Sequence, residues 1–148
     1  MRAVIQRVSQ ASVTVDDKLT GTVGIGLLVL IGVVDDDTDE DLDYLVRKIT
    51  QMRIFEDENG KMNLALKDVG GSLLAVSQFT LLADTKKGNR PSFTGAGSPD
   101  FSKKMYLRFI ERCRSLGFRT EEGVFGAHMV VSLVNDGPVT ISIDSKNR

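Results

Sequence analysis

The segment GLLVLIGVV, residues 26–34, limits what this chain can fold into more than any other stretch, because it is apolar throughout. A strand with one wet face alternates apolar and polar residues, so a continuous apolar run predicts a strand that is buried on both faces. The full run, from Ile25 to Val34, is too short and too rich in glycine for a membrane-spanning helix. We therefore expect a central strand with packed layers on both sides, and no membrane association.

The other strand predictions come from alternation and from β-branched residues. Residues 16–21, DDKLTG, are predicted to form a turn, and Asn59-Gly60 is a strong hairpin signal. Further strands are predicted at 2–8, 11–15, on both sides of Asn59-Gly60 within 53–66, and at 71–83, 118–126, 127–134 and 139–143. In this scheme Asp136-Gly137-Pro138 connects the last two strands.

Two segments have helical periodicity. Thr38 is placed to cap a helix with acidic residues in its first turn, followed by apolar positions at Leu42, Leu45, Val46, Ile49 and Met52. Ser98-Pro99-Asp100 opens a second helix with a cap, a first-turn proline and an acid in order. Its predicted apolar face consists of Phe101, Met105, Phe109, Cys113 and Leu116, and Gly117 ends it.

Many strands and two helices without regular alternation predict an α+β (mixed α/β) fold, with a largely antiparallel, barrel-like sheet. The 148 residues fit a single domain, 1–148, that buries a sufficient core. The start, MRAVIQRV, lacks the apolar stretch of a signal peptide, and a single cysteine suits a reducing compartment. These features predict a cytoplasmic protein.

Several site chemistries are excluded by residue counts. With one histidine, His128, and one cysteine, Cys113, no Cys/His cluster can form a zinc site. Glycine loops that bind nucleotides, GxGxxG or Walker A, do not occur. We expect neither a metal nor another cofactor. A lone histidine at the start of a strand is more often structural than a general base, so catalysis by His128 is not expected.

The segment AVSQFTLL, residues 75–82, places Ser77, Gln78 and Thr80 in an otherwise apolar strand. Unpaired buried polar groups are costly, by about 1–3 kcal/mol each. Either neighbouring backbone satisfies these side chains or they belong to a site. In a regular strand Ser77 and Thr80 face opposite ways, so they serve one pocket only if the strand ends or bulges there.

The loop that follows, DTKKGNRPSFTG, brings together the basic residues Lys86, Lys87 and Arg90. The second helix adds basic residues, although the net charge of the chain is −1. Such a patch is either a solvated surface or a contact for phosphates, which position a nucleic acid without reading its sequence. A patch of this size on a slightly acidic protein suits a discrete RNA end better than a long duplex.

Three motifs, SQFT at 77–80, KGNRPSFTGAGSP at 87–99 and NDGPVT at 135–140, closely resemble those of D-aminoacyl-tRNA deacylases. The opening MRAVIQRV and GKMNLAL match as well, so the resemblance covers essentially the whole chain. It implies a homodimer that hydrolyses the ester joining a D-amino acid, or mischarged glycine, to the 3′ end of tRNA, without a metal.

The resemblance also implies residue roles. Gly137 and Pro138 form a cis peptide that reaches into the partner's active site as a chiral filter, and Arg7 steadies it. Ser77, Gln78, Phe79 and Thr80 surround the scissile carbonyl, and the terminal 2′-hydroxyl of the RNA assists. Apart from the resemblance, the basic loop itself makes Lys86, Lys87 and Arg90 the expected tRNA contacts. Backbone N–H groups can stabilise an oxyanion without a titrating side chain, which accounts for the lack of a catalytic triad.

Two alternatives stay open at this point. One is a conventional esterase with Thr80 as the nucleophile, which would need His128 or a carboxylate as its base. The other is a non-catalytic nucleic-acid-binding module that uses the basic loop and helix.

Overall fold

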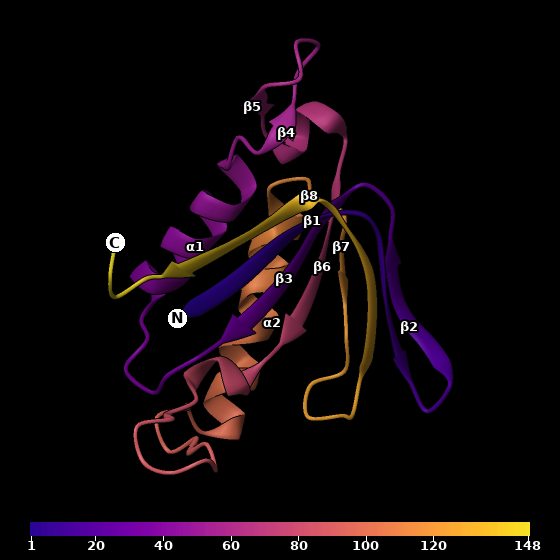
Figure 1. The fold of residues 1–148 in the computed structure, drawn as a ribbon. Coiled ribbons are helices and arrows are strands. Elements are labelled where there is room, and N and C mark those ends of the chain that lie inside the picture. The colour runs from indigo at the N-terminus through magenta and orange to yellow at the C-terminus, as the bar shows by residue number, and fades with distance from the viewer.

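The computed structural model describes all residues, 1–148, as a single α+β unit built on one mixed sheet (Figure 1). The elements in chain order are β1 (Arg2–Val15), β2 (Lys18–Val23), β3 (Gly26–Gly32), α1 (Asp39–Gln51), β4 (Phe55–Glu56), β5 (Met62–Leu64), η1 (Leu66–Val69), β6 (Ser72–Ser77), η2 (Phe79–Leu82), α2 (Pro99–Ser115), β7 (Thr120–Glu122) and β8 (Val130–Asp144). The predicted fold class and the two main helices are confirmed. No helix has the length and apolar character that crossing a membrane requires.

The sheet is organised around the long strand β1. Along one edge, β1 pairs antiparallel with β3 through residues 2–8 and with β2 through residues 11–15. Along the other edge it pairs antiparallel with β8. The strands β3, β6 and β7 continue the sheet in parallel. The sheet curves until β2 approaches β7: a Cβ added to Gly21 would lie 2.7 Å from the Glu122 carbonyl oxygen. This curvature gives the predicted barrel-like form.

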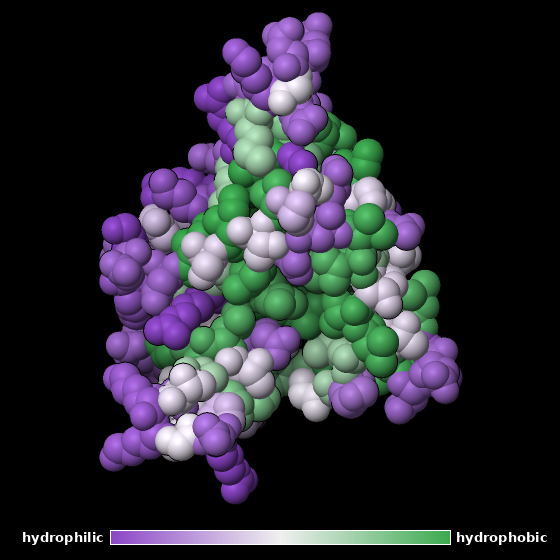
Figure 2. All heavy atoms as spheres, viewed as in Figure 1, coloured by the Kyte–Doolittle hydropathy of each residue, from purple (hydrophilic) through white to green (hydrophobic).

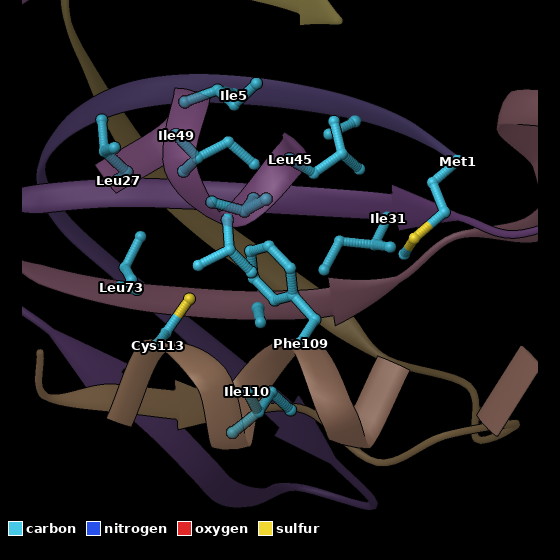
Figure 3. Packing of buried hydrophobic residues seen from close by; sticks show 14 of the residues in the cluster. Met1, Ile5, Leu27, Ile31, Leu45, Ile49, Leu73, Phe109, Ile110 and Cys113 are labelled. Atoms are coloured by element: carbon cyan, nitrogen blue, oxygen red, sulfur yellow. The ribbon is translucent and has the colours of Figure 1, made fainter. Parts of the chain in front are cut away.

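The strand β3 is buried on both faces, as its apolar sequence predicts. Leu27, Val29 and Ile31 join the larger core, which lies between the sheet and the two helices (Figure 3). Leu28 points into a second cluster on the opposite face, together with Val8, Ala11, Val13, Val23, Leu74 and Val76. Because side chains alternate along a strand, one apolar run supplies both cores.

The two helices cover the same face of the sheet and pack against each other through the larger core (Figures 1 and 3). Helix α1 begins after Thr38, as predicted, and the Asp41 carboxylate accepts a hydrogen bond from the backbone N–H of this N-cap residue. In α2 the predicted apolar positions Met105, Phe109 and Cys113 are buried and Phe101 is half-buried against the core. Leu116 is 58% exposed and lies at the C-cap. The prediction for Leu116 is wrong because the helix has already ended there, and the chain turns outward at Gly117, which has a φ of +91°.

Other local predictions need correction. The predicted turn over residues 16–21 is only Asp16 and Asp17, which both have positive φ, and Lys18 already begins β2. The strands expected at 2–8 and 11–15 are one strand. The strand expected at 71–83 stops at Ser77, where the chain turns into the short 3-10 helix η2.

The largest correction concerns the C-terminal strands. Residues 130–144 form one strand, β8, rather than two strands joined by a turn. The turn signal Asp136-Gly137 lies inside this strand, at a point where its pairing with β1 shifts register between Asn135 and Thr140. The segment is therefore a bulge on a continuous strand, and long-range pairing with β1 overrides the local turn preference.

Candidate functional site

The carboxyl end of β6 opens onto a cavity of about 580 Å³. Ser77 is the last residue of the strand and pairs with Ile31 of β3, and the Gln78 backbone N–H donates to the Ile31 carbonyl at 2.7 Å. The lining residues are mostly apolar or aromatic and come from segments far apart in the sequence: Ile31, Val33, Val76, Ser77, Gln78, Phe79, Phe93, Ala96, Gly97, Pro99, Ser102, Phe125, Gly126, Ala127, His128, Met129 and Val131.

The end of the strand resolves the difficulty with opposite-facing side chains. Because η2 begins at Phe79, Ser77, Gln78 and Phe79 all reach the cavity wall. Thr80 does not line it: this residue is exposed, and its hydroxyl accepts a hydrogen bond from the Gln78 side chain. The structure therefore brings Ser77, Gln78 and Phe79 to the cavity, whereas Thr80 lies outside the lining and contacts Gln78.

Backbone donors accompany these side chains. Phe79 and Thr80 are the first residues of η2, so their N–H groups have no acceptor within that helix. Donors of this kind at a strand end can stabilise negative charge on an oxygen. Phe79 itself is 55% exposed and packs edge-on against Phe93, with ring centroids 5.1 Å apart, at the cavity wall.

The loop after η2 forms another wall and is held at its base. Asp84 and Ser92 exchange backbone hydrogen bonds of 2.8 and 2.9 Å, and the Gly97 N–H donates to the Val33 carbonyl at 2.8 Å. Asp35 accepts from both the N–H and the hydroxyl of Ser98, at 2.7 and 3.1 Å. The loop base is thus fixed beside the cavity.

The basic residues Lys86, Lys87 and Arg90 lie between Asp84 and Ser92, at the tip of this loop. All three are exposed, and none forms an ion pair with a carboxylate. Their charges are available to an anionic partner that reaches the cavity.

His128 also lines the cavity, although sequence reasoning assigned it a structural role. Its side chain is exposed, and it is the only titratable group in the lining. No carboxylate lines the cavity, and no hydrogen bond joins His128 to Ser77. The arrangement is not that of a nucleophile and base within hydrogen-bonding reach of each other.

The bulge in β8 forms a second structural feature. The Gly137–Pro138 peptide bond is cis, as the resemblance predicted, and Asp136, Gly137 and Pro138 are exposed. The buried Arg7 donates to the Asp136 carbonyl at 2.8 Å and to the Ile54 carbonyl at 2.7 Å.

Asn135 and Val139, to which sequence reasoning gave no role, hold the bulge in place. The Asn135 side chain accepts from the Val139 N–H at 3.1 Å and donates to the Thr140 hydroxyl at 3.0 Å. Val139 is buried in the larger core. The exposed part of the bulge is therefore Asp136, Gly137 and Pro138, which lie between Asn135 and the buried Val139. In the sequence, the Asn at the start of NDGPVT was the available signal for a side chain that braces this segment.

The bulge and the cavity are far apart within one subunit. Arg7, beside the bulge, pairs with Leu27 of β3, whereas Ser77 pairs with Ile31. Four residues along β3 correspond to roughly 13 Å, and the three strand spacings from β8 to β6 add roughly 14 Å across the sheet. Neither Gly137 nor Pro138 lines the cavity.

Comparison with known proteins identifies the family. The family model described as D-Tyr-tRNA(Tyr) deacylase matches residues 4–144. The chain belongs to this family. It is 57% identical to a D-aminoacyl-tRNA deacylase from Thermosipho africanus (strain TCF52B), over 99% of this chain and 98% of the relative. It is also 57% identical to a D-aminoacyl-tRNA deacylase from Kosmotoga olearia (strain ATCC BAA-1733 / DSM 21960 / TBF 19.5.1), over 100% of this chain and 99% of the relative.

The fold is shared as well. The structure described as "c-Myc DNA Unwinding Element Binding Protein" superposes with a TM-score of 0.91 at 42% identity, covering 97% of this chain and 98% of the other. The resemblance seen in the sequence motifs is thus confirmed for the full length of the chain. Membership of the deacylase family also confirms the expectation of an enzyme that hydrolyses carboxylic esters.

Proposed function

We propose that this protein hydrolyses the ester between a D-amino acid and the terminal ribose of tRNA, and that it also removes glycine mischarged on tRNA. The observation that carries the proposal is the cavity at the end of β6, which joins polar groups of the SQFT motif to an apolar and aromatic chamber in a deacylase-family chain. The terminal nucleoside enters the chamber, and the ester lies against Ser77 and Gln78.

The proposed chemistry needs little from the side chains. An aminoacyl ester is already reactive, and water adds to its carbonyl while the Phe79 and Thr80 N–H groups stabilise the oxyanion. The C–O bond to the ribose then breaks, and the departing oxygen takes up a proton. The neighbouring 2′-hydroxyl of the RNA assists in moving this proton. Support for this route comes from the cavity lining, which holds no carboxylate and no nucleophile paired with a base.

The proposed chiral filter uses the bulge of a second subunit. Gly137 and Pro138 are exposed and braced by Arg7, and they lie too far from Ser77 to act in the same subunit. In a homodimer, the bulge of one chain enters the cavity of its partner. A rigid backbone there excludes an L side chain by steric clash, whereas glycine has no side chain to exclude.

Lys86, Lys87 and Arg90 are proposed to contact the phosphates near the 3′ end. They are exposed and unpaired at the tip of the loop whose base lines the cavity. Contacts of this kind position the RNA and weaken as salt concentration rises.

The decisive experiment compares ester loss from D-Tyr-tRNA, L-Tyr-tRNA and Gly-tRNA, with buffer alone as the measure of spontaneous hydrolysis. Fast release from the D and glycyl substrates, with the L substrate at the spontaneous rate, is expected. Equal rates for the D and L substrates would remove the filter from the proposal, and release from neither would leave a nucleic-acid-binding role.

That second candidate has one specific observation in its favour: the similar solved structure carries the name of a DNA-binding protein. Fluorescence anisotropy with labelled duplex and single-stranded DNA tests it directly. Tight binding that is lost in the triple variant Lys86→Ala, Lys87→Ala, Arg90→Ala would support it.

A further inference from the structure

Ser102 presents a hydroxyl group to the cavity that nothing in the protein satisfies. The residue lies in the first turns of α2, lines the cavity and is only 9% exposed. Every fully enclosed side-chain nitrogen or oxygen in the molecule has a hydrogen-bond partner. The Ser102 hydroxyl has none, so it must open onto the cavity.

Space in front of this hydroxyl is kept free by Gly97. A Cβ added to Gly97 would lie 2.8 Å from the Ser102 Oγ and 3.1 Å from the Val33 carbonyl oxygen. The loop is held at this point by the hydrogen bond from Gly97 to Val33. Any larger residue at position 97 would therefore cover the hydroxyl or displace the loop.

Ser102 stands across the cavity from the SQFT motif. The Tyr106 hydroxyl donates to the Ala75 carbonyl at 2.8 Å, which fixes α2 against β6. Helix α2 runs opposite to β6 (Figure 1). Ser102 precedes Tyr106 by one turn, about 6 Å, and Ser77 follows Ala75 by about 7 Å in the same direction. The two serine residues thus lie at the same level on facing walls.

The surroundings of Ser102 suit a planar ring with a polar edge. Phe93 and Phe125 line the same cavity, and aromatic side chains are common partners for stacked bases. The Ser102 hydroxyl faces the cavity without a protein partner, and a hydroxyl can both donate to a ring nitrogen and accept from an amino group. A ligand that supplies such an edge would complete the site.

We propose that Ser102 is a specificity-determining residue that hydrogen-bonds the base edge of the terminal adenosine while the ester lies at Ser77. This inference rests on the proposed function, because it takes the terminal nucleoside of the substrate as the occupant of the cavity. Ser102 has no part in the bond-breaking step.

The test uses binding of a stable substrate analogue, the amide of a D-amino acid with 3′-amino-3′-deoxyadenosine, measured by calorimetry. Ser102→Ala should weaken binding between about twofold and tenfold, the range of a single hydrogen bond. Ser115→Ala is the matched control: it lies on the same helix, is exposed and bonds only the Arg112 carbonyl, so affinity should not change. Melting temperatures of both variants verify folding.

Analogues with altered bases separate recognition from a structural role. Purine, 1-deazaadenine and 7-deazaadenine versions each lack one polar group of the adenine edge. The wild type should lose affinity for at least one of them, and Ser102→Ala should lose nothing further with that analogue. Unchanged affinity in Ser102→Ala, equal weakening with all the analogues, or failure of the wild type to bind the adenosine amide would each overturn the proposal.

Kinetics distinguish this proposal from the deacylase proposal. With D-Tyr-tRNA, Ser102→Ala should raise KM by the same factor and leave kcat unchanged. A wild type that binds the analogue through Ser102 but leaves D-Tyr-tRNA intact would retain the Ser102 site and end the deacylase proposal. If the wild type and Ser102→Ala hydrolyse D-Tyr-tRNA with the same KM, the deacylase proposal is retained and the proposed role of Ser102 is overturned.

Discussion

Arg7 and Asp136 are joined where β1 and β8 lose their register: the Arg7 Nε donates to the Asp136 carbonyl at 2.8 Å and lies 3.8 Å from the Asp136 carboxylate. The same guanidinium donates to the Ile54 carbonyl. Arg7 is 5% exposed, and it connects the bulge to the segment that follows α1. One buried fork therefore sets the position of an exposed backbone segment.

Replacing Arg7 with Lys should show that the fork, and not only the charge, is required. A lysine cannot reproduce two N–H donors in fixed directions, so at least one carbonyl loses its partner. The free energy of unfolding should fall by about 1.5–3 kcal/mol, the range for hydrogen bonds to charged groups. Urea denaturation measures this. Arg2→Lys, at an exposed ion pair with Asp144, is the control and should cost under about 1 kcal/mol. Equal losses in the two variants would contradict this role for Arg7.

Gly137 is the position at which a methyl group should damage the proposed filter. Its φ is +138°, a region that L residues rarely adopt, and an added Cβ would lie 2.9 Å from an Arg7 nitrogen and 2.8 Å from the Val139 side chain. Gly137→Ala should reduce D-Tyr-tRNA deacylation at least tenfold in a protein that still folds. Gly60→Ala, at a positive φ in an open turn, controls for backbone strain alone and should keep full activity. Wild-type activity in Gly137→Ala would remove this residue from the site.

Thr80 should be dispensable for the chemical step. Its hydroxyl accepts from the Gln78 side chain and does not line the cavity. We expect Thr80→Ala to keep single-turnover rates within about tenfold of wild type, because the loss is that of one hydrogen bond that orients Gln78. A collapse by several orders of magnitude, with tRNA binding intact, would instead support the esterase with Thr80 as nucleophile.

Sequence reasoning performs well where local pattern and tertiary packing agree. The apolar run of β3, the caps at Thr38 and Ser98, and the Asn59-Gly60 hairpin all lie where local chemistry places them. It fails at β8, where Asp136-Gly137 signals a turn but pairing with β1 carries the strand through it. A register shift depends on a partner about 130 residues away, so no local signal reveals it.

The candidate site was predictable only where a local sequence pattern marked it. The polar residues of SQFT were visible as exceptions in an apolar strand. The opposite walls of the cavity were not, because Phe93, Ser102, Phe125 and His128 come from three separate segments that only the fold brings together. His128 in particular had no pattern to distinguish a cavity residue from a structural one.

Acid should destabilise the contact between α1 and the C-terminal segment. Burial raises the pKa of Asp41, but hydrogen bonds from Lys146, Thr38 and Ser145 outweigh it and hold this pKa well below its usual value. A carboxyl with a lowered folded pKa stabilises above its unfolded pKa, near 4, and this contribution is lost as pH falls below that value. Asp41→Asn should therefore lower the melting temperature at pH 7 and flatten its decline between pH 4 and pH 2. An unchanged pH profile in Asp41→Asn would contradict this.

Alkali should act through Cys113. Burial raises the pKa of this thiol to about 12, because the thiolate would lie in the apolar core. The folded state keeps the proton that the unfolded chain releases near pH 9, so Cys113 makes stability fall as pH rises from about 9 to 12. The slope is at most about 1.4 kcal/mol per pH unit. Cys113→Ala should lose this component, and native protein at pH 8 should resist iodoacetamide until denaturant is added. Rapid alkylation of the native protein would show that the thiol is accessible.

Dimerisation should be a condition of activity, since the bulge and the cavity of one subunit lie too far apart to cooperate. The strand β8 pairs only with β1, which leaves its other edge open, and such edges readily pair with a second chain. Apolar side chains gather over this part of the surface (Figure 2), and Val130 and Val134 of β8 are 55% and 47% exposed.

Sedimentation should give twice the 16.2 kDa mass of the chain. Val134→Glu should shift the protein toward monomer and reduce deacylation in proportion. Leu107→Glu, at a similarly exposed apolar residue of α2, should change neither. A fully active monomer would refute the shared site, because Gly137 and Pro138 could then take no part in it.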